Sequence, residues 1–158
     1  MQKDKIERGD LCKDVITGFE GIALTTCTNL HNCDTVGLHP QEVKDGKPAD
    51  GFNFDVPQVI ILEKGKLTPM EADPLTVDLG AEVEDTMSSY KGVVTGIATF
   101  FNGCVRVGVQ CSELHEGKPI DREWFPMQQL KVVTPPQVAT PTRTGGPMDM
   151  ARKMSGPR

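Results

Sequence analysis

Apolar and polar residues alternate along residues 90–110, YKGVVTGIATFFNGCVRVGVQ, and the dipeptide Asn102-Gly103 interrupts the alternation. A period of two is typical of a half-buried β-strand, because successive side chains point to opposite faces of a sheet. Asn-Gly is favoured in tight turns, since both residues tolerate a positive φ. The stretch therefore predicts a β-hairpin in which Gly103 has a positive φ.

An earlier stretch, FEGIALTTCTNLHNCDTVGLH at 19–39, has the same pattern and aligns with the first without a gap at an offset of 71 residues. The alignment extends back to Gly9 and Gly80 and forward to two apolar segments, VIIL at 59–62 and LKVV at 130–133. Matches that all keep one offset indicate a tandem duplication.

Each copy of the repeat is expected to be all-β. Several short strands separated by turns, with one longer loop before the last strand, are typical of a small SH3-like barrel. The predicted fold class is therefore all-β, a tandem duplication of two small SH3-like barrels with an extended Pro-rich C-terminal tail. The predicted boundaries are a first barrel at 1–62, a linker at 63–79, a second barrel at 80–133 and an extended basic arm at 134–158.

Charge and composition narrow the possible partners. The formal net charge of −5 argues against non-specific nucleic-acid binding, which needs a basic surface. No apolar run is long enough to span a bilayer, and the N-terminus lacks the apolar core of a signal peptide. The five cysteines are expected to be free thiols. We therefore expect neither nucleic acid nor membrane as a partner, and a protein that acts in a cytoplasm or in an assembly formed there.

The segment CTNLHNC could supply three metal ligands at short spacing, Cys27, His31 and Cys33. In the second copy Ala98 and Asn102 stand where Cys27 and His31 stand in the first. A metal that held the fold together would not be lost from one copy, so a turn with small buried thiols is the favoured alternative. We expect no metal and no cofactor.

Other candidate motifs also favour structural interpretations. Cys33 and Cys104 recur after the hairpin turns, either as reactive thiols or as small apolar residues packed beneath a turn, and the second is favoured. Gly-Lys-Pro occurs at 46–48 and 117–119, but a phosphate-binding loop needs a helix after it. The histidines have no Ser or Asp partner at a recognisable spacing. The sequence therefore contains no predicted catalytic residues, and an enzyme is not expected.

The aromatic residues divide into core and surface candidates. Phe54 and Phe125 occupy equivalent positions and are expected in the core. Trp124 has no apolar counterpart, because Asn53 stands at its position in the first copy. Trp124 and the hairpin residue Phe101 are therefore candidates for partner contact. Burial between the two barrels is the alternative for Trp124.

The segment 134–158, TPPQVATPTRTGGPMDMARKMSGPR, is rich in Pro, Thr and Gly and cannot build a core. Its basic residues outnumber its acidic one, whereas both copies of the repeat are acidic. This contrast favours an arm that lies on another protein surface, and a solubilising tail is the alternative. The candidate partner-binding residues are Trp124, Phe101, Arg143, Arg152, Lys153 and Arg158.

The module TGFEGIA…NGC…GVQ…GKP…WF…QQLKVV, carried by 17–62 and 88–133, resembles one from an uncharacterised family of small tailed-bacteriophage proteins. The resemblance implies a phage origin and a compact barrel fold, and it transfers no active residues. The expected function is structural: a capsid decoration or stabilising protein, or another minor head or tail component. It would sit in the virion, assembled in the host cytoplasm, and bind capsid or other virion proteins and neighbouring copies of itself. The alternative is a non-virion accessory protein that binds a host protein or a small ligand in the infected cell.

Overall fold

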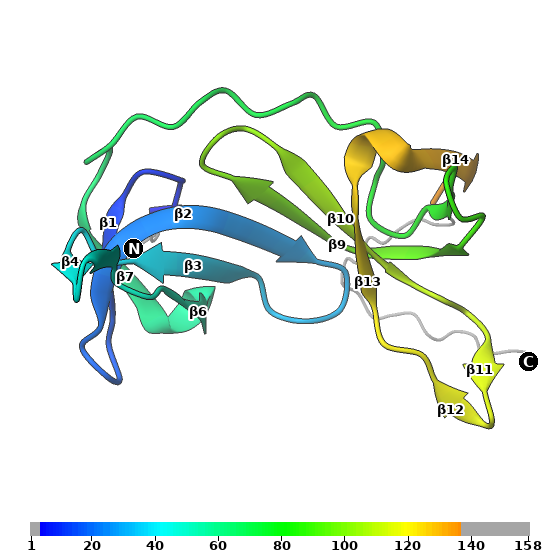
Figure 1. Ribbon diagram of the computed structural model, residues 1–158, viewed down its shortest axis with the longest axis horizontal. Helices are drawn as coiled ribbons and strands as arrows, with labels where there is room; N and C mark the ends of the chain where they lie inside the picture. Colours follow the sequence, from blue (N-terminus) through cyan, green and yellow to red (C-terminus); the bar gives the residue numbers. More distant parts are fainter. Residues whose placement is uncertain (1–3, 137–158) are drawn as a thin grey trace, which may run out of the picture.

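The computed structural model describes residues 4–136, which form an all-β fold with two short 3-10 helices (Figure 1). The strands of the first half are β1 (Leu11–Asp14), β2 (Glu20–Asn29), β3 (Thr35–His39), β6 (Phe52–Asp55) and β7 (Val59–Glu63). Those of the second half are β8 (Glu82–Asp85), β9 (Lys91–Phe100), β10 (Val105–Gln110), β13 (Glu123–Pro126) and β14 (Leu130–Thr134). The 3-10 helices η1 (Val56–Gln58) and η2 (Met127–Gln129) precede the last strand of each half. No helix among the described residues is long and apolar enough to cross a bilayer.

The two halves have the same strand order. Antiparallel pairing gives β7-β1-β2-β3-β6 in the first half and β14-β8-β9-β10-β13 in the second. Within residues 4–136 no pairing joins β6 to β7 or β13 to β14, so neither half is a closed barrel. The helices η1 and η2 lead the chain away from β6 and β13, and the last strand then pairs with the first strand of its half instead. The all-β class is confirmed, whereas the predicted closure is absent from the strand pairing.

A strand pair between β2 and β9 joins the halves into one central six-stranded sheet, ordered β6-β3-β2-β9-β10-β13. Cys27 lies opposite Ala98, its own equivalent at the 71-residue offset, and Thr26 lies opposite Thr99, the equivalent of Thr28. An antiparallel pair has a local two-fold axis perpendicular to the sheet at its centre. Because the centre of this pair joins equivalent residues, the same axis approximately relates the two halves.

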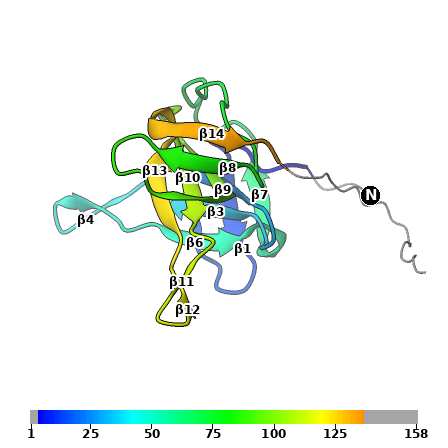
Figure 2. The same cartoon turned by 90° about the vertical axis from the view of Figure 1, so that its right-hand side faces the viewer.

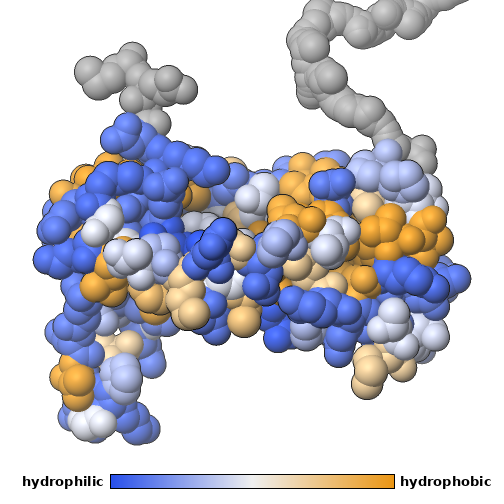
Figure 3. Space-filling model, turned by 90° about the horizontal axis from the view of Figure 1, so that it is seen from above, coloured by the Kyte–Doolittle hydropathy of each residue, from blue (hydrophilic) through white to orange (hydrophobic). Residues whose placement is uncertain are grey.

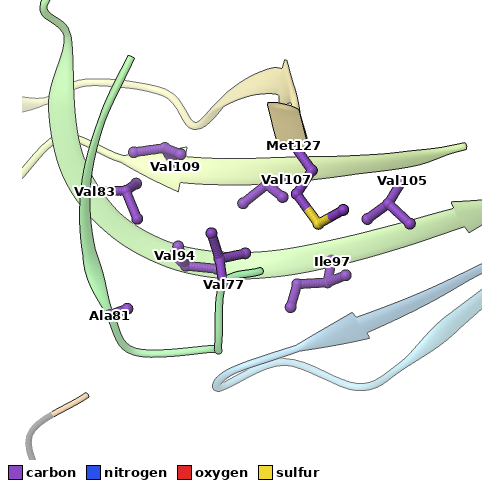
Figure 4. Close-up of a cluster of buried hydrophobic side chains, with 9 residues drawn as sticks. All are labelled: Val77, Ala81, Val83, Val94, Ile97, Val105, Val107, Val109 and Met127. Carbon is purple, nitrogen blue, oxygen red and sulfur yellow. The ribbon is translucent and has the colours of Figure 1, made fainter. Parts of the chain in front are cut away.

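Each half buries its own hydrophobic cluster. In the second half valines from β8, β9 and β10 converge beneath Met127 of η2 (Figure 4). The cluster of the first half is Ile6, Cys12, Ala23, Val36, Leu38 and Val59. Phe54 and Phe125, predicted as core residues, pack against the two clusters and remain partly exposed. Full burial of a Val, Leu, Ile or Met side chain contributes roughly 1.5–3 kcal/mol to folding stability. Each half therefore has a core large enough to define its own fold.

A buried aspartate fixes the turn after the first strand of each half. Asp14 accepts hydrogen bonds from the backbone N–H and the hydroxyl of Thr17 at 2.8 and 2.5 Å. Asp85 accepts the equivalent bonds from Ser88 at 2.9 and 2.5 Å. The amide of Gln58 donates a further bond to Asp14 at 2.8 Å. These hydrogen bonds lower the pKa of Asp14 to about 2, with the largest effect from the Thr17 hydroxyl and the next largest from the Gln58 amide.

The linker runs as an extended segment from β7 to β8, as the green arch in Figure 1 shows. Its backbone is hydrogen-bonded to the first half through Leu67 N–H and Gly9 O, at 2.9 Å. It is also bonded to the β9–β10 turn, where Met70 N–H donates to Phe101 O at 3.0 Å. The linker is therefore held by both halves.

Candidate partner-binding surfaces

Two small β-hairpins stand away from the body of the molecule (Figures 1 and 2). They are β4 (Val43–Lys44) with β5 (Lys47–Pro48), and β11 (Leu114–His115) with β12 (Lys118–Pro119). In Figure 2 the first extends to the left and the second downward. Each turns on an acidic residue and a glycine with positive φ: 54° and 78° at Asp45-Gly46, 52° and 77° at Glu116-Gly117. These are the dihedrals of the tight turn that suits the twist of a hairpin.

Each hairpin presents one large apolar side chain to solvent. Val43 is 74% exposed and Leu114 is 65% exposed, and the two residues are equivalent at the 71-residue offset. Figure 3 shows hydrophobic atoms on an otherwise hydrophilic lobe that projects at the lower left. Because this exposed apolar character recurs at equivalent positions of both halves, the two hairpins are candidate contact surfaces.

Apolar exposure also recurs at two other equivalent pairs. Ile16 and Met87 occupy the turns after β1 and β8, with 74% and 78% of the side chain exposed. Leu62 and Val133 lie on the last strands and are 44% and 45% exposed. At all three pairs the residue type differs between the halves while its apolar character is the same. At some other equivalent positions the class itself changes, as where Ala81 stands in place of Asp10.

Trp124 lies half-buried beside the junction of the two halves. In the sheet Trp124 faces Gly108, Gly108 faces Gly96, and Gly96 faces Asn29 of the first half. These two glycines leave a trough, because a Cβ atom on either would lie 2.7 Å from the Arg122 side chain. Trp124 thus has an intramolecular neighbourhood that spans the junction.

Arg122 fills this trough. Its guanidinium carbon lies 4.6 Å from the centre of the Trp124 ring, within range of a cation–π contact. Its Nη1 donates to Asn29 Oδ1 at 3.0 Å, so the side chain reaches from the residue before β13 across to β2. Sequence reasoning missed Arg122, because its role depends on two glycines on neighbouring strands that no sequence spacing connects.

Phe101 is half-buried in the β9–β10 turn. Its carbonyl accepts the linker bond from Met70 described above. Arg8 of the first half donates through Nη1 to Phe100 O at 2.7 Å and to Met70 O at 3.0 Å. Hydrogen bonds around Phe101 therefore connect the first half, the linker and the second half.

A groove of about 930 Å³ lies between the N-terminal segment, the start of the linker and β2. Threonines of the central sheet and charged residues of both signs line it, among them Thr26, Thr28, Thr99, Lys5 and Asp34. Figure 3, which views the molecule from above, shows a largely hydrophilic surface over much of this half. Apolar residues, among them Ile6 and Leu67, also line the groove, so its surface is mixed in character.

Asp10 holds one wall of this groove. Its buried carboxylate accepts from Glu7 N–H at 2.8 Å, Gly65 N–H at 2.8 Å and Lys64 Nζ at 2.9 Å. Burial raises the pKa of Asp10, but these hydrogen bonds and the Lys64 charge outweigh it and lower the pKa below its usual value. The N-terminal segment and the linker are thereby fastened to the same residue.

Of the residues considered as metal ligands, Cys27 lies on β2, and His31 and Cys33 lie in the turn that follows it. Cys33 and Cys104, predicted to pack beneath the hairpin turns, are both exposed. Each lies within its turn, before the next strand begins at Thr35 or Val105, and is therefore not covered by the sheet. His31 is exposed and Cys27 is partly buried, with a pKa raised by that burial. Among residues 4–136 no group of three or more His, Cys, Asp or Glu side chains is arranged to hold a metal.

The basic candidates of the arm, Arg143, Arg152, Lys153 and Arg158, lie outside the described residues. The last strand β14 ends at Thr134, one residue beyond the predicted boundary, and the Thr134 hydroxyl donates to Glu82 Oε1 at 3.1 Å.

No protein-family profile, no curated protein and no solved structure matches this chain.

Proposed function

We infer that the chain is a non-catalytic structural protein of a tailed-phage virion, as a capsid decoration or stabilising protein or another minor head or tail component. The observation that carries this proposal is the pair of equivalent hairpins with exposed Val43 and Leu114. A protein that offers the same contact twice suits a partner that repeats, and a virion shell is such a partner. Two linked weak contacts also bind more tightly than either alone.

Each half is interpreted as an opened variant of an SH3-like barrel. The supporting observation is the order β7-β1-β2-β3-β6, with a 3-10 turn before the last strand, which recurs as β14-β8-β9-β10-β13. The duplication then places two binding modules on one continuous sheet. The basic segment that follows Pro136 adds a further contact with an acidic surface, either a virion protein or a neighbouring copy of this chain.

Mass spectrometry of purified virions tests this proposal. Peptides from this chain should be abundant in particles that remain after density-gradient purification. They should stay at the same ratio to the major shell protein through a second gradient. Particles that carry no such peptides, although infected cells contain the protein, would overturn the virion assignment.

A second candidate function is an accessory protein that binds a host protein or a small ligand in the infected cell. The groove of about 930 Å³ beside Asp10 favours it, because a cavity of that size with mixed charge can hold a polar ligand. A chain found only in the soluble fraction of infected cells would support this candidate. Substitution of Thr28 by Arg, which would narrow the groove, should then abolish activity in the cell and leave virions unchanged.

A further inference from the structure

The two hairpins are related by the approximate two-fold axis of the β2–β9 junction. A two-fold axis perpendicular to a sheet carries each face of that sheet onto itself. Equivalent parts of the two halves therefore lie on the same side of the central sheet. The two hairpins are equivalent parts, so both lie on one side of it. Figure 1 shows the two hairpins toward opposite ends of the molecule.

The hairpins also offer the same chemistry. Each carries one exposed apolar side chain, Val43 or Leu114, on its first strand. Each carries a lysine at the start of its second strand, Lys47 or Lys118, and neither lysine forms an ion pair among the described residues. A surface that receives one hairpin, with an apolar socket and a carboxylate beside it, is therefore suited to receive the other.

We propose that one chain bridges two copies of the same partner subunit, which are themselves related by a two-fold axis, with one hairpin seated on each copy. The two hairpins are related by a two-fold rotation. The partner must therefore present two copies of the socket that are related by the same rotation. A single asymmetric subunit does not do this, whereas a symmetric pair of subunits does so by construction. This inference rests on the proposed function and adds to it the symmetry and the socket chemistry of the partner.

Two like contacts on one rigid sheet bind with avidity. A single side chain of this size is too small a contact to hold a complex alone. When the first hairpin is seated, the second meets its socket at a high effective concentration, which raises the apparent affinity by a factor of about 10²–10⁴. Loss of either hairpin should therefore remove that factor, and the two losses should be similar.

Binding to particles of the encoding phage, assembled without this chain, tests the proposal. Val43→Asp, Leu114→Asp and the double variant are compared with the unchanged protein. Leu75→Asp is the control, because Leu75 is also exposed, at 55%, but lies in the linker and belongs to neither copy of the repeat. Circular dichroism and thermal melts should show that all four variants stay folded, since the three positions are exposed.

We expect each single hairpin variant to bind about 100-fold more weakly, the double variant not to bind, and Leu75→Asp to bind unchanged. At saturation one chain should be bound for every two partner subunits. Unchanged binding of both single variants would overturn this inference and leave the virion assignment standing. So would loss of binding from one hairpin variant alone. Failure of the unchanged protein to bind would overturn both proposals. Self-association abolished by Val43→Asp would identify a second copy as the occupant and also overturn the inference.

Discussion

At the scale of single residues, Gly103 combines a conformational requirement with a close contact. Its φ is +91°, as the Asn-Gly turn predicted, and a Cβ atom there would lie 2.3 Å from the linker carbonyl of Glu71. Gly103→Val should therefore lower the free energy of unfolding by about 2–4 kcal/mol, since it adds backbone strain and displaces the linker. A chemical denaturation curve measures this loss.

Gly18→Ser is the matched control for that experiment. Gly18 also has a positive φ, +80°, but no atom lies within 4 Å of its absent Cβ. Its equivalent in the second half is Ser89, which adopts a φ of 67°. Gly18→Ser should therefore cost less than about 1 kcal/mol. Equal losses at Gly18 and Gly103 would show that the contact with the linker contributes nothing.

Acid stability is the second property set by single residues. The pKa of Asp14 is about 2 in the folded protein and about 4 in an unfolded chain. Its ionised form is therefore favoured by folding, and this stabilisation is complete above pH 4 and is lost as the pH falls towards 2. Asp14→Asn should lower the melting temperature at pH 7 and should flatten its decline between pH 4 and 2. A decline as steep as that of the unchanged protein would contradict this assignment.

Sequence patterns predicted some residues well and others poorly. The turn residue Gly103 and the partly buried Phe54 and Phe125 follow from local chemistry and from the repeat. The exposure of Cys33 and Cys104 did not follow, because the direction of a side chain after a tight turn depends on the strand register. The contacts of Arg122 depend on Gly96 and Gly108, which come together only in the folded sheet.

At the scale of elements, the junction between the halves depends on the pairing of β2 with β9 and on the Arg122 side chain laid across it. Arg122→Ala should lower the free energy of unfolding by about 1–3 kcal/mol, since it removes a partly buried hydrogen bond and a cation–π contact. Trp124 is the one tryptophan of the chain, so its fluorescence reports on this site directly. Its emission should shift to longer wavelength as water reaches the ring.

Arg106→Ala separates this role from a general effect of charge. Arg106 lies on the neighbouring strand β10 and donates to the Trp124 carbonyl at 3.1 Å, but its side chain is exposed. Its loss should change stability by less than about 1 kcal/mol and should leave the emission unchanged. Equal shifts in the two variants would mean that Arg122 does not cover the ring.

Elements differ in how far the sequence predicts them. The first strands, the long hairpins and the last strands lie where alternation and turn residues place them. The strands β6 and β13 and the hairpins β4–β5 and β11–β12 fall in what reads as one long loop. The strands of the two small hairpins have only two residues each, which is too short for alternation to register, and their pairing is set by the turn between them.

At the scale of the whole molecule, the offset of 71 residues predicted two halves of one topology but not their arrangement. The residue pattern of a strand does not determine which other strand it will pair with. The meeting of equivalent residues at Cys27 and Ala98 emerges only from the folded register. That register gives the molecule its approximate symmetry, and with it the two hairpins on one side.

Removal of the basic arm is the test that belongs to this scale. Truncation after Pro136 keeps all of β14, including Thr134 and its hydrogen bond to Glu82. The described fold should therefore be unaffected, and the melting temperature should match that of the full chain. Under the virion function that we propose, binding to virion particles should weaken at low salt, because four basic side chains are lost with the arm.

The salt dependence identifies the cause of that weakening. Contacts between exposed opposite charges are screened as ionic strength rises, with a Debye length of about 10 Å at 0.1 M and about 3 Å at 1 M. The full chain should therefore lose affinity with added salt, while the truncated chain loses less, and the two should converge at high salt. Replacement of the four basic residues by Gln in the full-length chain should reproduce the truncation. If instead the truncated chain binds as tightly as the full chain at every salt concentration, the arm makes no contact with the particle and serves only to solubilise the protein.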